Sequence, residues 1–379
     1  MSGKTELFLV AGEVSGDIHG AELLQALANK RGDLVIRGLG GPQMQANFPD
    51  IDNWLADAAV LGFVEVLRKY RYFRDKLVTI GAQIIHSNPA AVILIDYPGF
   101  NLRLAKRLRD QGYGGKLIYY ISPQVWAWKK GRIETMAKLL DLMICIFPFE
   151  KDLYEKSGLK TVFSGHPLID KFAERRANAP KRDANLVALL PGSREREIEA
   201  LFPIMLASAR ILSRDRPELR FATAGASPEL TEMLSGQVSD AGLTDVVSAG
   251  ELDSYDIMQR SAVGVVASGT ATLEAAALGL PYCLIYKVAW LTAWVARTVL
   301  KVKFLGIVNV IAGREVVREM LQESAKPEAL AAELGRLLDD EVSRSDLLRD
   351  LEEVIETLGE GGAHQRAADA VVSELELLP

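Results

Sequence analysis

Two turns in the second half of the chain carry residues that suit phosphate binding. The first turn, residues 191–194, follows the apolar run 186–190 and precedes a helix-period segment. Free N–H groups at a helix N-terminus attract anions, Gly192 allows close approach of the backbone, and Arg194 can bind phosphate through two parallel hydrogen bonds. The alternative is an ordinary strand–helix turn in which Ser193 is the N-cap.

A second turn of the same kind follows the apolar run at residues 264–267. Ser268, Gly269 and Thr270 precede an alanine-rich helix, and their hydroxyl and N–H groups suit a second phosphate or a ribose. Glu274 lies one turn into this helix, where a carboxylate can accept both hydroxyls of a ribose; the alternative is a capped helix with a solvated glutamate. Two such turns in one half favour a nucleoside diphosphate.

Asp96 in the first half is a candidate general base. The segment ILIDYPGFN, residues 93–101, predicts a buried strand that ends at the acid, and then a turn at Pro98 and Gly99 that starts a helix. Ligands of open α/β sheets bind beyond the carboxyl ends of the strands, so a carboxylate at this position can take a proton from a substrate. The alternative is a turn former or a helix cap.

The turn after the first strand, VAGEVSGDIHGAEL, is also rich in glycine. Its glycines are four residues apart, unlike GxGxxG, and the second strand ends in glycines instead of the acid that binds a ribose in dinucleotide sites. Hydride-transfer chemistry is therefore disfavoured. Asp17 either faces a ligand or caps the first helix, and His19 is either a site residue or an exposed helix residue. His166, in SGHPLID, is a further candidate where the chain passes into its second half.

Two stretches, residues 63–77 and 288–304, combine aromatic and basic residues, as helices in a membrane interface do. The alternative for both is an amphipathic helix packed in the core with a solvated basic face. Arg297 interrupts the second stretch, so its uncharged part is too short to cross a bilayer. The first stretch supplies the candidate membrane patch: Phe63, Val64, Leu67, Arg68, Lys69, Tyr70 and Arg71.

A scaffold of parallel strands is predicted to position these residues, because short apolar runs alternate with helix-period segments along the chain. The predicted strands span residues 6–11, 34–38, 91–96, 116–121, 142–147 and 161–164 in the first half, and 186–190, 219–224, 245–248, 264–267 and 281–286 in the second.

The predicted fold class is α/β, with two doubly wound, Rossmann-like domains that face each other across a cleft. Residues 1–170 form the first domain, the polar residues 171–185 a linker, with a helix extension at its start as an alternative, and residues 186–340 the second domain. Residues 341–379 form a helical tail that packs back on the first domain or on a partner. Loops from both domains would line the cleft.

Composition disfavours several other classes of protein. The 379 residues are 49% hydrophobic and 25% charged, which fits a large globular core, and the net charge of −6 does not indicate nucleic-acid binding. Two cysteines without a CxxC motif and four scattered histidines disfavour a zinc site. The Asp-x-Asp pattern of Asp50 and Asp52 lies in a polar loop without a preceding strand, which disfavours a divalent metal site. No signal peptide is predicted.

Nine motifs together resemble the lipid-A-disaccharide synthase family of inverting glycosyltransferases, which have the GT-B architecture. The motifs occur in the order of the family and span residues 10–322. They are VAGEVSGDIHGA, GFVEVL, IDYPGFN, SPQVWAW, FPFE, GHPL, LPGSR, ASGTATLE and NVIAGREVVREMLQ.

The resemblance implies a specific reaction. The family transfers 2,3-diacylglucosamine from its UDP derivative to the 6-hydroxyl of 2,3-diacylglucosamine 1-phosphate, which gives UDP and the β-1,6-linked lipid A disaccharide 1-phosphate. It implies no metal or other cofactor and a peripheral location at the cytoplasmic face of the inner membrane. It leaves a homodimer open.

The resemblance also implies roles for individual residues. Asp96 matches the general base, and Arg194 is the second catalytic residue, next to the UDP leaving group. The implied nucleotide site contains Gly192, Ser193, Arg194, Ser268, Gly269, Thr270, Glu274, Asn309, Arg314 and Glu315. The implied acceptor side contains Glu13, Ser15, Gly16, Asp17 and His166.

Three other functions fit part of the pattern. A UDP-sugar 2-epimerase has the same two-domain architecture and nucleotide site but needs no lipid acceptor. A non-catalytic protein that binds UDP or lipid would bind UDP without releasing it from a donor. A dinucleotide-dependent dehydrogenase would need the glycine motif that the first turn lacks.

Overall fold

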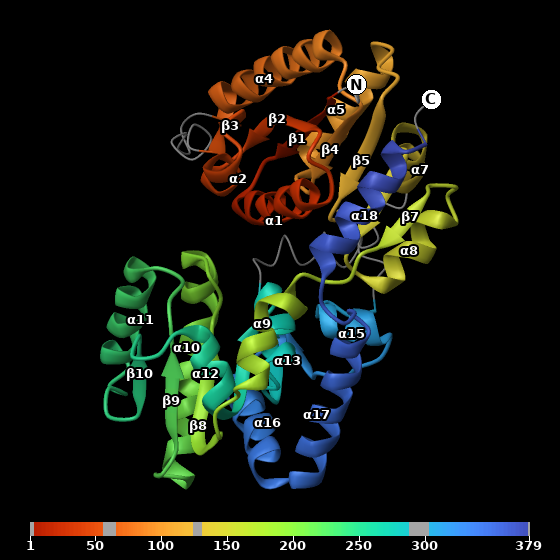
Figure 1. The fold of residues 1–379 in the computed structure, drawn as a ribbon. Helices are drawn as coiled ribbons and strands as arrows, with labels where there is room; N and C mark the ends of the chain where they lie inside the picture. Colours follow the sequence, from red (N-terminus) through yellow and green to blue (C-terminus); the bar gives the residue numbers. More distant parts are fainter. Residues whose placement is uncertain (1–3, 56–65, 124–130, 288–302, 378–379) are drawn as a thin grey trace. The chain divides into compact units, whose positions relative to one another are not determined.

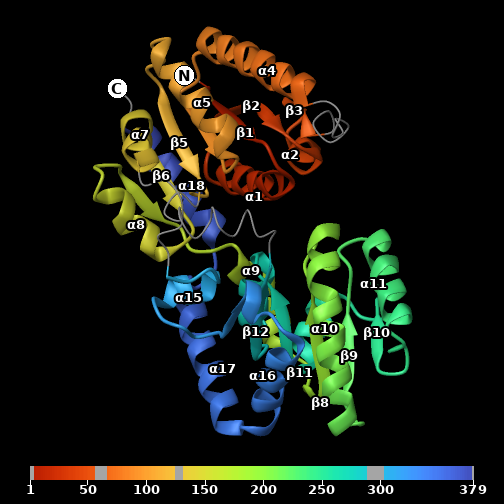
Figure 2. The same ribbon diagram turned by 180° about the vertical axis from the view of Figure 1, so that it is seen from behind.

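The computed structural model describes residues 4–55, 66–123, 131–287 and 303–377, except for the side chains of residues 66–70. The chain forms two compact units: unit 1 contains Met1–Pro167 and Leu358–Pro379, and unit 2 contains Leu168–Thr357. Each unit is a parallel β-sheet flanked by helices (Figures 1 and 2). The predicted α/β fold class with two doubly wound domains is confirmed.

The sheet of unit 1 has the strand order β3-β2-β1-β4-β5-β6-β7. Its strands are β1 (Thr5–Ala11), β2 (Leu34–Gly40), β3 (Ile51–Asn53), β4 (Ala91–Ile95), β5 (Lys116–Tyr120), β6 (Leu142–Cys145) and β7 (Thr161–Phe163). The order reverses between the neighbouring strands β1 and β4, and ligands of such sheets bind at the carboxyl ends of the strands at this switch point.

Helices cover both faces of this sheet. They are α1 (Val14–Lys30), α2 (Pro42–Asn47), α4 (Val66–Ser87), α5 (Pro98–Asp110), α7 (Gly131–Leu139), α8 (Pro148–Glu155) and α18 (Ala363–Leu375). Helix α1 packs against α18, and α4 packs against α5 on the opposite side of the sheet (Figures 1 and 2). On the α4–α5 side, buried residues such as Phe8, Leu94 and Leu104 form one core, and each contributes roughly 1.5–3 kcal/mol by burial.

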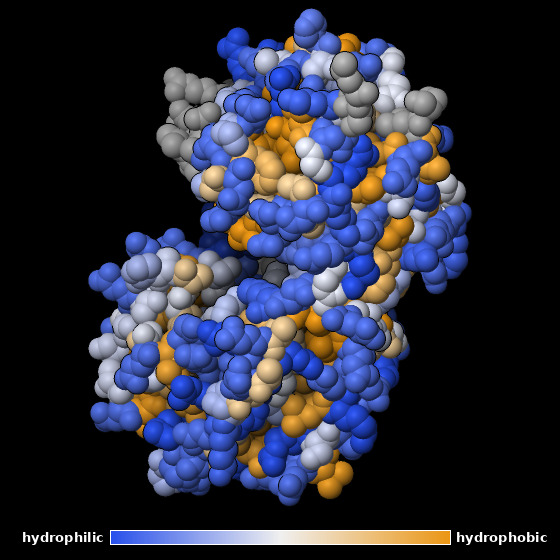
Figure 3. Space-filling model, in the orientation of Figure 1, coloured by the Kyte–Doolittle hydropathy of each residue, from blue (hydrophilic) through white to orange (hydrophobic). Residues whose placement is uncertain are grey.

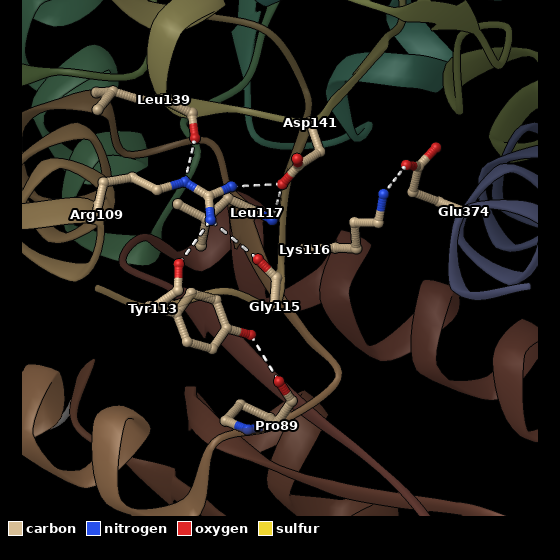
Figure 4. Close-up of polar contacts among 9 residues, drawn as sticks. All are labelled: Pro89, Arg109, Tyr113, Gly115, Lys116, Leu117, Leu139, Asp141 and Glu374. Atoms are coloured by element: carbon tan, nitrogen blue, oxygen red, sulfur yellow. Dashed lines mark hydrogen bonds and ion pairs between the residues drawn. The ribbon is translucent and has the colours of Figure 1, made fainter. Parts of the chain in front are cut away.

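Helix α18 belongs to unit 1 although the whole of unit 2 precedes it in the sequence. Its Glu374 is 3% exposed and accepts hydrogen bonds from Lys116 at 2.8 Å and Lys160 at 2.7 Å. Figure 4 shows Lys116 beside a second polar group, in which Arg109 pairs with Asp141 at 2.5 Å. These contacts lie at the amino ends of the strands, so the opposite edge of the sheet remains for ligands.

The sheet of unit 2 has the strand order β10-β9-β8-β11-β12-β13. Its strands are β8 (Asp183–Leu190), β9 (Arg220–Thr223), β10 (Val247–Ala249), β11 (Ser261–Ala267), β12 (Tyr282–Tyr286) and β13 (Glu319–Leu321). Here the order reverses between the neighbouring strands β8 and β11, which places the switch point of unit 2 at their carboxyl ends.

The described helices of unit 2 pack against its sheet and against one another. They are α9 (Leu168–Ala177), α10 (Glu195–Asp215), α11 (Pro228–Asp240), α12 (Ser254–Arg260), α13 (Thr270–Ala277), α15 (Ile307–Ala312), the 3₁₀ turn η2 (Gln322–Ser324), α16 (Pro327–Asp339) and α17 (Glu341–Glu356). Helix α10 packs against α11 and α16, whereas α13 packs against α9, α12, α15 and α17.

The structure corrects the linker predicted at residues 171–185. Helix α9 occupies the first part of this segment, and β8 begins at Asp183. The basic residues that made the segment look like a linker have acidic partners far away in the sequence: Lys171 binds Glu274 at 2.9 Å, and Arg175 binds Asp256 at 2.8 Å. The predicted helical tail is also divided, because α17 belongs to unit 2 and α18 to unit 1.

Candidate functional site

A pocket of about 340 Å³ lies at the carboxyl edge of the sheet of unit 2. It brings together both glycine-containing turns that the sequence singled out. The predicted nucleotide-site residues that line it are Gly192, Ser193, Arg194, Ser268, Gly269, Thr270 and Glu274. Seven of the ten residues predicted for nucleotide binding thus share one pocket, which fits a single ligand that contacts both turns.

The switch point explains why these two turns meet. Strands β8 and β11 are hydrogen-bonded neighbours, with Leu190 opposite Val266, so the turns that follow them leave the sheet side by side. Helices α10 and α13 begin at these turns, and their N-cap residues, Arg194 and Gly269, make no side-chain capping hydrogen bond in the described structure. The first N–H groups of both helices are therefore available to a phosphate.

Glu197 currently occupies part of this anion site. Its Oε2 accepts the N–H of Ser193 at 3.3 Å, and its Oε1 pairs with the guanidinium of Arg194 at 3.0 Å. Gly192 has φ +111°, and a Cβ at this position would lie 2.4 Å from Glu197 Oε2. A carboxylate thus already binds the donors that a phosphate needs, and Arg194, 81% exposed, is free to turn towards a ligand.

Glu274 is an ion-paired residue, not the solvated glutamate of the alternative interpretation. Its Oε1 accepts from Lys171 Nζ at 2.9 Å and from the Tyr255 hydroxyl at 3.1 Å. Lys171 also donates to the Tyr255 hydroxyl at 2.6 Å, which closes a triangle. Both contacts use Oε1, so Oε2 retains its capacity to accept hydroxyl groups of a ligand.

Sequence reasoning missed a third wall of this pocket. The turn after β9, which contains Gly225, lines it together with Tyr255 from α12. The signal was available as TAGAS, residues 223–227, a run of small residues that begins at the end of a predicted strand. Tyr255 had no such signal, because its place depends on the packing of α12 against β8 and β9.

Three residues assigned by the family resemblance lie outside the described lining of this pocket. Asn309 is buried: its side-chain N–H groups donate to Val317 O at 2.7 Å and to Glu319 Oε1 at 2.9 Å. Arg314 pairs with Asp350 at 2.6 Å. Glu315 lines a different pocket, beside α16 and α17. Their assignment to the nucleotide site remains a prediction.

In unit 1, Asp96 follows β4 at the switch point and is held in a strained backbone. Asp96 and Tyr97 have φ of +45° and +46°, a left-handed conformation that costs non-glycine residues free energy. The carbonyl of Asp96 accepts hydrogen bonds from Asn101 Nδ2 at 2.8 Å and the Tyr119 hydroxyl at 2.5 Å. Such over-determined strain is concentrated at functional sites, which strengthens the prediction for Asp96.

The surroundings of Asp96 make its carboxylate a stronger base than an ordinary aspartate. Burial, together with the negative charge of Glu13, raises the pKa of Asp96 to about 6. The group is therefore mostly ionised at neutral pH and close to the pKa that suits general-base catalysis there. Glu13, in the turn after β1, and Ser15, in the first turn of α1, are both exposed, and β1 is the strand next to β4.

The raised pKa predicts how the Asp96→Asn variant will change stability with pH. A carboxyl pKa that rises on folding favours the native state at low pH, and this contribution is lost as the pH rises through about 6. Asparagine resembles the protonated form, so the variant should be more stable than the wild type above pH 6, by up to about 3 kcal/mol. Thermal melting at pH 4.5 and 7.5 checks this. A variant that is less stable at pH 7.5 would contradict it.

The structure corrects the role predicted for Asp17. Its side chain is 1% exposed, and its carboxylate accepts the N–H groups of Gly41 at 2.7 Å, Gln43 at 2.9 Å and Met44 at 3.0 Å. These are the first N–H groups of α2, so Asp17 caps the second helix from within the first. It does not face an acceptor, and the alternative of a cap on its own helix is also wrong.

The remaining acceptor-side candidates are placed differently from one another. Gly16 is buried in the first turn of α1, and a Cβ added at this position would lie 3.7 Å from the carbonyl oxygen of Ile95. His166 is half-buried, and burial together with His19 lowers its pKa to about 3, so its ring is neutral at physiological pH. His19 lies near His364, with 3.4 Å between ring nitrogens. The acceptor role of Gly16 and His166 remains a prediction.

Two further predictions from the sequence concern a metal site and a membrane-binding patch. Among the described residues, no group of three or more His, Cys, Asp or Glu side chains could hold a metal ion. Phe63 and Val64 lie outside the described residues, whereas Leu67, Arg68, Lys69 and Tyr70 belong to the first turns of α4, and Arg71 is exposed.

Within the described chain, no helix is both long and apolar enough to cross a bilayer. The face drawn in Figure 3 is largely hydrophilic and carries apolar residues in separate patches, which is normal for a protein surface.

Comparison with known proteins identifies the family. The family model of lipid-A-disaccharide synthetase matches residues 7–372. The chain belongs to the lipid-A-disaccharide synthase family. A lipid-A-disaccharide synthase of Myxococcus xanthus is 38% identical over 386 residues, which cover 100% of this chain and 99% of the relative. The lipid-A-disaccharide synthase of Geobacter metallireducens is also 38% identical, over 97% of each chain.

Solved structures with low sequence identity share the fold of this lipid-A-disaccharide synthase family member. A UDP-GlcNAc 2-epimerase of Neisseria meningitidis bound to UDP-GlcNAc aligns with TM-score 0.62 at 12% identity, over 97% of this chain and 100% of that one. A Medicago truncatula structure complexed with UDP-glucose aligns with TM-score 0.55 at 12% identity, over 98% of each chain. The fold is thus shared with a UDP-sugar epimerase, and it is the sequence family that decides for a glycosyltransferase. The family predicted from the nine motifs is confirmed.

Proposed function

We propose that the chain transfers 2,3-diacylglucosamine from UDP-2,3-diacylglucosamine to the 6-hydroxyl of 2,3-diacylglucosamine 1-phosphate. The products are UDP and the β-1,6-linked lipid A disaccharide 1-phosphate. The main support beyond family membership is Asp96, an ionised carboxylate with a raised pKa at the switch point of unit 1. A base for the acceptor in one unit and a diphosphate pocket in the other match the two needs of sugar transfer.

The acceptor hydroxyl needs a base because its own pKa lies far above neutral pH. Asp96 takes the proton as the hydroxyl oxygen forms a bond to the anomeric carbon and the bond from that carbon to the diphosphate oxygen breaks. One in-line displacement inverts the configuration at the anomeric carbon. A base that is well placed for this proton contributes about 10²–10⁴-fold in rate.

The diphosphate gains negative charge as it leaves, and the pocket of unit 2 supplies the counter-charges. The N–H of Ser193 and the guanidinium of Arg194, both now bound to Glu197, can turn to the phosphates. The start of α13 at Gly269 offers further N–H groups. Preorganised donors of this kind stabilise the developing charge in the transition state more than the ground state.

UDP release tests the proposed reaction. The purified chain is incubated with UDP-2,3-diacylglucosamine, with and without 2,3-diacylglucosamine 1-phosphate, and UDP is measured. We expect release that depends on the acceptor and that persists in excess EDTA. Release without acceptor would contradict the transfer, and conversion of UDP-N-acetylglucosamine alone would support an epimerase instead.

We also propose that the chain binds the cytoplasmic face of the inner membrane peripherally, through residues 63–71, of which residues 66–71 belong to α4. Reversing the charges of Arg68, Lys69 and Arg71 should reduce sedimentation with anionic vesicles, because each basic residue near such a surface contributes about 1 kcal/mol. The matched control reverses Arg210, Arg214 and Arg220 in unit 2. Equal binding of both variants and the wild type would rule out this patch.

A further inference from the structure

A second pocket, of about 440 Å³, lies in unit 1 between α4 and the start of α5. Its volume is within the range of about 300–1,000 Å³ that small-ligand sites occupy. Aromatic and aliphatic side chains form most of its described lining, together with two arginines. The lining residues are Phe73, Arg74 and Leu77 of α4, and Tyr97, Gly99, Phe100 and Arg103 at the start of α5.

The pocket has a preformed aromatic wall. The buried Trp54 ring lies 5.0 Å from Phe100 and 5.9 Å from Phe73, as measured between ring centroids. Its indole N–H donates to the Ala11 carbonyl at 2.7 Å, which fixes the ring to the end of β1. Rings held in this way keep the pocket open without a ligand and offer apolar surface to one.

The pocket adjoins the proposed base. Tyr97, the residue after Asp96, is part of its wall, and both residues have the left-handed backbone that turns the chain at this point. Tyr97 packs so closely over Gly12 that a Cβ there would lie 2.1 Å from its ring. The position of Tyr97 is thus fixed. A molecule in the pocket lies against Tyr97 and therefore next to Asp96, the proposed base.

Charge at the pocket favours an anionic amphiphile. Arg74 pairs with its neighbour Asp75 at 3.0 Å, whereas Arg103 is exposed and has no ion pair within the described part of the chain. Apolar walls beside an exposed cation match a molecule that has an alkyl chain and a phosphate. In the proposed reaction, the acceptor combines both features and must also reach Asp96.

We propose that this pocket binds one acyl chain of the acceptor, with the acceptor phosphate towards Arg103. This inference rests on the proposed function, because that function supplies the acylated acceptor. The proposal places an acyl chain of the acceptor, and not one of the donor, in the pocket. The reason is that the pocket belongs to the same unit as Asp96, the proposed base for the acceptor. The size of the pocket thereby determines which acyl chain lengths are accepted on the acceptor.

Gly99 allows the pocket to be filled without disturbing the fold. A Cβ at Gly99 would meet nothing within 4 Å, and the residue has no positive φ. Gly99→Leu should therefore insert a side chain into the pocket. Gly114→Leu is the matched control: Gly114 is also exposed and open, and it precedes β5 at the amino edge of the same sheet.

The test compares acceptors with long and with truncated acyl chains. For Gly99→Leu, we expect kcat/KM for the long-chain acceptor to fall about tenfold or more, as when roughly two methylene groups are kept out of an apolar site. With the truncated acceptor it should equal that of the wild type, and Gly114→Leu should leave both values unchanged. Equal losses with both acceptors, or no loss, would overturn the assignment.

Binding separates failure of this inference from failure of the proposed reaction. Calorimetric titration of 2,3-diacylglucosamine 1-phosphate into wild type and Gly99→Leu needs no turnover. Weaker binding of the acceptor by Gly99→Leu would support the pocket assignment even if the wild type released no UDP. Absence of UDP release would refute only the proposed reaction. Arg103→Ala should weaken binding of the phosphorylated acceptor but not of the same lipid without phosphate, whereas Lys106→Ala should change neither. Equal affinities of wild type, Gly99→Leu and Arg103→Ala would overturn the inference.

Discussion

Asp96→Asn is expected to slow sugar transfer by about 10²–10⁴-fold, the contribution of a well-placed general base. Asparagine keeps the size of the side chain and matches its protonated form, so the left-handed turn at residues 96–97 should persist. UDP affinity should not change, because the described lining of the phosphate pocket belongs entirely to unit 2. Steady-state kinetics of UDP release and a UDP titration measure the two quantities.

The control for this variant is Asp110→Asn at the exposed end of α5. Asp110 pairs with Lys106 at 2.6 Å on the surface, an interaction that contributes little to stability. Its loss should leave transfer unchanged. If Asp96→Asn retains transfer within about tenfold of the wild type, Asp96 is not the base.

Arg194→Ala should both weaken UDP binding and slow transfer. The side chain lines the phosphate pocket at the start of α10, and a preorganised donor to a developing charge is worth about 2.7–4 kcal/mol, or roughly 10²–10³-fold in rate. Arg194→Lys should recover only part of the loss, because lysine keeps the charge but not the forked geometry. Calorimetry with UDP and steady-state kinetics give both values.

Arg196→Ala provides the matched control for this position. Arg196 lies two residues along the same helix and is exposed, but it is not among the residues that line the pocket. Its removal should change neither affinity nor rate. Equal effects of Arg194→Ala and Arg196→Ala would show a general charge effect and remove Arg194 from the phosphate site.

The central strands and the residues that follow them were predictable from the sequence. Buried parallel strands are nearly continuous apolar runs, so β4 and β8 stand out, and Asp96 and Gly192 are conspicuous because they interrupt such runs. The edge strands β3 and β13 were not predicted, because each is three residues long and includes a charged residue, Asp52 in β3 and Glu319 in β13, so no apolar run marks it.

What could not be predicted depends on contacts between residues far apart in the sequence. Asp17 looked like a ligand-binding acid beside glycines, but its partners are the N–H groups of residues 41–44, which only the folded chain brings near. Lys171 was assigned to a linker, because its ion pair with Glu274, about a hundred residues away, cannot be read from the sequence. The apolar pocket beside Tyr97 likewise arises from the packing of α4 on α5.

The pH dependence of acceptor-dependent UDP release tests the central claim, that Asp96 is the base of a sugar transfer, most directly. For the wild type, log kcat/KM should rise with unit slope up to about pH 6 and level off above it, because the ionised form of Asp96 is the active one. The residual activity of Asp96→Asn should lack this rising limb of the pH profile below about pH 6. A wild-type profile that is flat between pH 5 and 7, or an unchanged limb in Asp96→Asn, would contradict the claim.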